Sequence, residues 1–138
     1  MPTTRPELSN KNKHWIPKAR YYELKWFCLQ YSGWKRMLKS IDISINTKSI
    51  ITVRSVTNEH SDDTAQIAML RKYLSDKISM IEQAAYSVAP ELYKALIFGV
   101  TENVPYDILK LKMDVPCGKE MYYKKYREFF YVLDKMRK

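Results

Sequence analysis

Cationic and polar side chains in the last third of the chain have types and spacing suited to contact with nucleic acid. Lysine and arginine donate hydrogen bonds to phosphates and to guanine, whereas glutamate accepts one from cytosine and a tyrosine hydroxyl serves in either role. We expect base contacts from Lys119, Glu120, Tyr123 and Lys124. We expect phosphate contacts from Lys110, Lys112 and Arg127.

Two helices joined by a tight turn would position these side chains. The apolar spacing predicts a first helix over 105–113 that buries Ile108 and Leu109. A turn is predicted over 114–118, since Pro116 and Gly118 interrupt the helical pattern there.

The last helix is predicted over 119–137. Its apolar residues recur at intervals of three and four, which gives one buried face made of Tyr122, Tyr126, Phe129, Leu133 and Met136. A short helix, a turn that contains glycine and a longer helix with basic first turns make up a helix-turn-helix, the layout that enters a major groove.

The basic residues are concentrated at both ends of the sequence. Twenty-four lysines and arginines against 15 acidic residues give a net charge of +9. Residues 1–39 carry a net charge of +7 and residues 104–138 carry +4, whereas residues 40–103 carry −2. This distribution favours a polyanionic partner, with two solvated basic surfaces as the alternative.

The N-terminal part divides into a tail and a helical region. Residues 1–17 are predicted to form a flexible basic tail. A helix is predicted over 18–31 with Gly33 as its stop, and a second helical piece over 34–39. The aromatic residues of this region are expected to face the core, on a stripe formed by Tyr22, Trp26, Leu29 and Trp34.

The middle of the chain changes its hydrophobic period. Isoleucines alternate with polar residues from Ile41 to Ile45, which predicts a short β-hairpin over 41–56, with an irregular connection as the alternative. A helix of about 26 residues is predicted from Asp62, and a further helix over 91–100 after Pro90. The apolar residues of the long helix have a heptad-like spacing. They could therefore form the contact of a coiled-coil homodimer as an alternative to packing within the chain, although Lys77 lies on the same stripe.

These elements predict a mainly α fold. We expect a helical domain with a C-terminal helix-turn-helix, divided into the tail 1–17, a first part over 18–60 and a second part over 61–138.

Several classes of site lack their residues. Cys28 and Cys117 are far apart in the sequence, and with only two histidines we expect no metal site and no cofactor. No glycine-rich phosphate loop or paired nucleophile and base occurs, so that an enzyme is not expected. No apolar run reaches the roughly 20 residues needed to span a bilayer. We therefore expect a cytoplasmic protein with no membrane partner.

The C-terminal half resembles the RinA and ArpU type late-gene transcription regulators of phages, and related uncharacterised phage proteins. The resemblance lies in DTAQIAMLRKYLSDKISMIEQA and in VTENVPYDILKLKMDVPCGKEMYYKKYREFFYVL, and it covers roughly residues 61–138. It implies a domain similar to the promoter-reading region of sigma factors, which binds double-stranded promoter DNA and activates phage genes. It places Lys119, Tyr123, Lys124 and Arg127 on the recognition helix. Gly118, where a Ser or Thr cap is usual, and the predicted hairpin depart from the pattern.

Two other binding functions remain open on sequence grounds. One is an inhibitor from a mobile element that binds a host CRISPR nuclease complex or its guide RNA channel, which would explain the basic N-terminal segment. The other is the DNA-recognition subunit of a phage packaging terminase. A transcription regulator would instead have DNA and RNA polymerase as partners.

Overall fold

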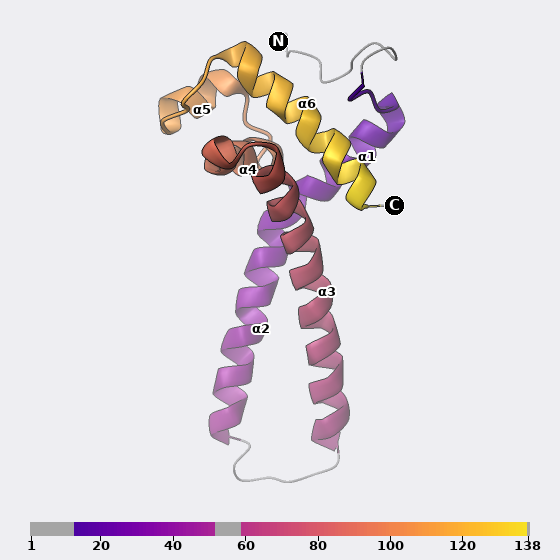
Figure 1. Cartoon of the computed structure of the whole chain (residues 1–138). Helices are drawn as coiled ribbons and strands as arrows, with labels where there is room; N and C mark the ends of the chain where they lie inside the picture. Colours follow the sequence, from indigo (N-terminus) through magenta and orange to yellow (C-terminus); the bar gives the residue numbers. More distant parts are fainter. Residues whose placement is uncertain (1–12, 52–58, 138) are drawn as a thin grey trace.

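The computed structural model of the chain describes residues 13–51 and 59–137, and it is mainly helical, as the sequence predicts. Its helices are α1 (Lys18–Leu29), α2 (Tyr31–Ile51), α3 (Glu59–Val88), α4 (Tyr93–Thr101), α5 (Tyr106–Lys112) and α6 (Lys119–Met136), with a 3₁₀ turn at Pro90–Leu92. Helices α2 and α3 pack side by side as a long arm, and the other helices gather at one end of it (Figure 1). Helix α6 begins beside α5 and ends beside α1 (Figure 1).

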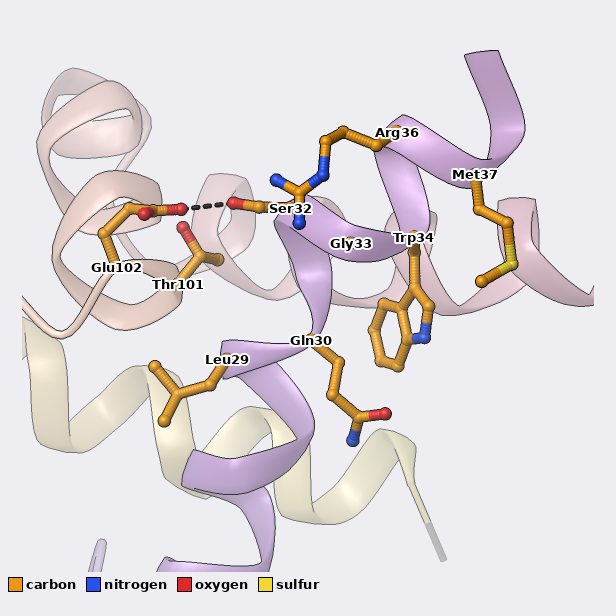
Figure 2. Close-up of a pocket in the computed structure, with 9 residues that line it drawn as sticks. All are labelled: Leu29, Gln30, Ser32, Gly33, Trp34, Arg36, Met37, Thr101 and Glu102. Atoms are coloured by element: carbon orange, nitrogen blue, oxygen red, sulfur yellow. Dashed lines mark hydrogen bonds between the residues drawn. The ribbon is translucent and has the colours of Figure 1, made fainter. Parts of the chain in front are cut away.

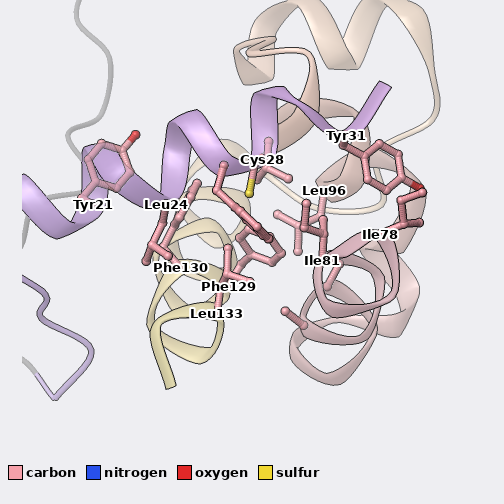
Figure 3. Close-up of a cluster of buried hydrophobic side chains, with 14 of the residues drawn as sticks. Tyr21, Leu24, Cys28, Tyr31, Ile78, Ile81, Leu96, Phe129, Phe130 and Leu133 are labelled. Atoms are coloured by element: carbon pink, nitrogen blue, oxygen red, sulfur yellow. The ribbon is translucent and has the colours of Figure 1, made fainter. Parts of the chain in front are cut away.

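One hydrophobic core joins the two predicted parts of the chain. Leu24 of α1 meets Ile81 of α3, Leu96 of α4 and Phe129 of α6 in this cluster, and all four side chains are fully buried (Figure 3). Helix α6 packs against both α3 and α1. The ranges 18–60 and 61–138 therefore share a core.

The predicted hairpin over 41–56 is wrong for the described part of that range, because residues 41–51 are helical and belong to α2. Residues 52–56 lie outside the described residues. Leu38 and Ile41 follow the buried Trp34 at helical spacing and are half-buried against the core. Asp42 forms an ion pair with Arg71 of α3 at 2.5 Å. Contact with α3 thus makes these residues helical, although the local alternation of isoleucines favours a strand.

The break between the first two helices lies at Gln30, and the prediction that Gly33 ends a helix is wrong. The Gln30 amide donates to the Phe27 carbonyl at 3.2 Å, and the Trp34 amide donates to the Gln30 carbonyl at 2.9 Å. Gly33 is therefore inside the first turns of α2.

Replacement of Gly33 by alanine should stabilise the fold by up to about 1 kcal/mol, because alanine loses less backbone entropy in a helix. Among the residues that the structure describes, an added Cβ would meet only the Arg36 guanidinium, at 3.9 Å. Thermal unfolding followed by circular dichroism tests this, and a lower melting temperature for Gly33→Ala would contradict the helical environment.

The buried face of α1 differs from the predicted stripe. Tyr21, Leu24, Phe27 and Cys28 are buried, whereas Tyr22 and Trp26 are exposed. Both α4 and α6 pack on α1, and they cover a face rotated by about one residue from the predicted one. Two large aromatic side chains are therefore left on the surface.

The long helix α3 is confirmed and begins three residues earlier than Asp62. Leu74, Ile78, Ile81 and Ala85 of its predicted stripe are buried. Lys77, also on that stripe, places its ammonium over the Phe27 and Trp34 rings at 5.3 and 5.6 Å. The stripe therefore packs within the chain along its second half.

The last residues of the predicted tail pack on α6. Ile16 is buried in the core, and the His14 ring lies against the Tyr131 ring with 5.2 Å between centroids. The flexible tail predicted for 1–17 is wrong at these positions, and residues 1–12 lie outside the described residues.

Candidate nucleic-acid interface

Helices α5 and α6 match the two helices predicted for the helix-turn-helix, with a connection over 113–118. Tyr106, at the start of α5, is buried and holds this connection closed. Its hydroxyl donates to the Cys117 carbonyl at 2.7 Å, and its amide donates to the Tyr123 hydroxyl at 3.2 Å. The first turns of α6 are thereby fixed relative to α5.

Tyr123 is buried, and the prediction that it contacts bases is wrong for the structure as it stands. Its hydroxyl accepts the Tyr106 amide, and its ring lies against the Tyr122 and Tyr126 rings, with centroids 5.1 and 5.6 Å away. Helix α5 covers one side of α6, so that α6 buries a wider arc than the single predicted face. Tyr123 positions the two helices instead of presenting a polar group.

Lys124 lies on the outward face of α6 and is exposed, as are Glu120 and Met121. With Gly118 and Lys119 they line a hollow of about 590 Å³. The Lys119 ammonium is 3.8 Å from the Asp107 carboxylate of α5, in a pair whose two side chains are solvated. An ion pair of this kind is weak, so that Lys119 can turn towards a phosphate at little cost.

The three residues predicted to contact phosphates differ in their exposure. Lys110 and Lys112 are exposed at the end of α5, and the Lys112 ammonium lies 5.6 Å from the centre of the Phe98 ring. Arg127 is half-buried, and burial lowers the pKa of its guanidinium. The accessible cations of this surface are therefore Lys110, Lys112, Lys119 and Lys124.

An aromatic ridge beneath this surface holds α6 on the body. Tyr122, Phe129 and Leu133 are fully buried as predicted. The Tyr126 hydroxyl is 2.9 Å from the Tyr21 hydroxyl of α1. At the far end, the Arg20 guanidinium donates to the Asp134 carboxylate at 2.6 Å, which raises the pKa of Arg20. By contrast Ile108 and Met136, both predicted to be buried, are exposed.

No side chain of the described residues caps the start of α6. Gly118 is the N-cap residue in an extended conformation, and its carbonyl accepts the Tyr122 amide at 3.0 Å. The first amides of a helix have no partner within it and favour an anion. An anion at this end would receive hydrogen bonds from them.

A second hollow, of about 450 Å³, lies where α1 meets α2 beside the end of α4 (Figure 2). Residues that line it include Gln30, Gly33, Arg36 and Glu102, and the Ser32 hydroxyl donates to the Glu102 carboxylate.

Among the described residues, no three His, Cys, Asp or Glu side chains come together as metal ligands would. No described helix is both long and apolar enough to cross a bilayer.

Sequence reasoning missed two features of this surface. Met121 is exposed beside Lys124, although methionine usually counts as a core residue. Tyr106 joins the two helices through both its amide and its hydroxyl, and only the adjacent Pro105 marked it as a helix start.

Comparison of the chain with known protein families, characterised proteins and solved structures finds no match.

Proposed function

We propose that this chain is a sequence-specific DNA-binding transcription regulator of a phage or prophage, and that it inserts the start of α6 into the major groove of double-stranded DNA. The observation that carries the proposal is the position of Lys124. It is exposed on the outward face of α6, directly opposite a fully buried aromatic ridge. A recognition helix needs both a polar outer face and a firm attachment to the body.

The geometry supports separate roles for the cations. Lys124 and Glu120 lie one helical turn apart on the outward face, where they would meet base edges. Lys119 and the uncapped amides of α6 would meet a phosphate on one side of the groove, and Lys110 and Lys112 would meet the backbone from α5. The rest of the assignment, a phage late-gene regulator that acts with RNA polymerase in the host cytoplasm, rests on the sequence resemblance.

Reversal of the charge at Lys124 should weaken binding to the preferred duplex about tenfold or more, because a base contact is lost and a carboxylate is brought near phosphates. The preferred duplex is first selected from a random library, in which a regulator should favour its site by roughly a thousandfold. Fluorescence anisotropy of the labelled duplex then compares Lys124→Glu with the unaltered chain.

Lys135→Glu is the matched control, since it makes the same charge change on the same helix, about 16 Å further along. Lys135 is exposed near the end of α6. The control should retain most of the affinity, and both variants should keep the helical circular dichroism of the parent. Equal weakening by the two variants would show that the start of α6 does not enter the groove.

A further inference from the structure

The outward face of α1 presents aromatic rings to solvent. Trp26 is 64% exposed and Tyr22 is 42% exposed, and they are four residues apart on the same helix. Trp15, just before the helix, is also exposed. Tryptophan is highly buried on average in folded proteins, so that a stripe of this kind indicates a binding surface.

The spacing of the two rings fits an unstacked strand and not a duplex. Four helical residues rise by about 6 Å, which is the axial separation of Tyr22 and Trp26. Successive bases in a duplex strand are only about 3.4 Å apart along the axis. Neighbouring bases could therefore cover both rings only after they leave their own stack, as they do in a single strand.

The segment of the chain that carries the stripe is rich in lysine and arginine. Residues 13–39 contain seven lysines and arginines and one acidic residue. That acidic residue, Glu23, is 2.9 Å from the Arg20 guanidinium, which the Asp134 carboxylate of α6 also contacts, at 2.6 Å. Lys25 is half-buried and Lys18 is exposed on the same helix. A stripe that bound an apolar protein surface would not need these cations, whereas a nucleic acid backbone does.

The stripe continues into the hollow between α1 and α2. The side-chain amide of Gln30 donates to the Trp26 carbonyl at 3.3 Å, and Gln30 also lines that hollow. Figure 2 shows the Arg36 side chain folded back across Gly33 towards Ser32. A strand that lies along Tyr22 and Trp26 and continues into this hollow would reach Arg36, which also lines it.

We propose that this aromatic stripe, made of Tyr22 and Trp26, binds single-stranded nucleic acid by base stacking, with Lys18, Lys25 and Arg36 on the phosphates. The surface is separate from the helix-turn-helix. Helix α1 lies beside the end of α6 (Figure 1), whereas the residues proposed to enter the groove lie at the beginning of α6. The full chain would hold a duplex at one end of α6 and an unpaired strand at the other.

The test titrates the full chain with 15-nucleotide oligodeoxyuridylate and oligouridylate, which differ only in the sugar, at low salt. Stacking should quench the tryptophan emission, and Trp26→Ala should weaken strand binding, measured by anisotropy of a labelled strand, about tenfold. Trp26→Phe keeps a ring and should stay within about threefold of the parent. Lys124→Glu should bind the single strand as the parent does, and comparison of the two strands identifies the preferred sugar.

Because Trp26 is exposed, its replacement should leave the circular dichroism unchanged, and loss of strand binding is then a loss of contact. The proposal is overturned if neither strand quenches the emission. It is equally overturned if Trp26→Ala binds as tightly as Trp26→Phe, or if strand binding disappears with Lys124→Glu instead.

Discussion

Replacement of Gly99 by alanine should destabilise the fold by about 2–3 kcal/mol, although alanine is the better helix former. Gly99 is buried in α4, and an added Cβ would lie 2.0 Å from the Tyr122 hydroxyl oxygen and 3.2 Å from Leu109 Cδ1. Tyr122 is fully buried, so that its ring has no free space to move into. The melting temperature should fall by on the order of 10 °C.

Removal of the Tyr122 hydroxyl should rescue this variant. The ring carbon that carries the hydroxyl is 3.4 Å from the added Cβ, an ordinary contact. That hydroxyl is buried and has no hydrogen-bond partner among the described residues, so that Tyr122→Phe alone should be neutral or stabilising by up to about 1 kcal/mol. Denaturant unfolding of both single variants and the double variant would give a coupling of about 2 kcal/mol. Additive effects of the two changes would contradict this packing of α4 on α6.

The sequence predicts the helices whose own residues determine them. The bounds of α5 and α6 follow from proline, glycine and a strict apolar spacing, and the structure agrees with both within about one residue. Residues 41–51 show the opposite case. Their isoleucines fit an alternating pattern, but Asp42 meets Arg71 and Ile41 meets the core only because α3, more than 20 residues later, lies alongside.

The sequence predicts correctly those residues of the candidate interface whose exposure depends only on the face of α6 on which they lie. Lys124 and Glu120 are exposed as expected, since they lie opposite Phe129 and Leu133 on α6. Tyr123 is buried because α5 covers a second arc of the same helix, which no property of α6 alone indicates. The same limit applies to α1, where two packed helices select Phe27 and Cys28 over Trp26 for the core.

Alkaline pH should unfold this protein steeply. Several tyrosine phenols and one cysteine thiol are buried in the core in their neutral form, and they ionise once unfolding exposes them to solvent. Burial raises the pKa of Tyr122, Tyr126 and Cys28, and burial together with a hydrogen bond to Glu82 raises that of Tyr31. In the unfolded chain the phenols ionise near pH 10. Their contribution to stability is complete below that pH and is lost as the pH rises above it.

Each such phenol lowers the free energy of unfolding by about 1.4 kcal/mol per pH unit above 10, so that the three together give at most about 4 kcal/mol per unit. With a domain stability of about 5–15 kcal/mol, the midpoint should lie between about pH 11 and 14. Circular dichroism and tyrosinate absorbance should change together for these residues. Tyr122→Phe should reduce the slope by about one third without loss of stability at neutral pH. Complete tyrosine ionisation while the helical signal persists would show that the phenols of the core are open to solvent.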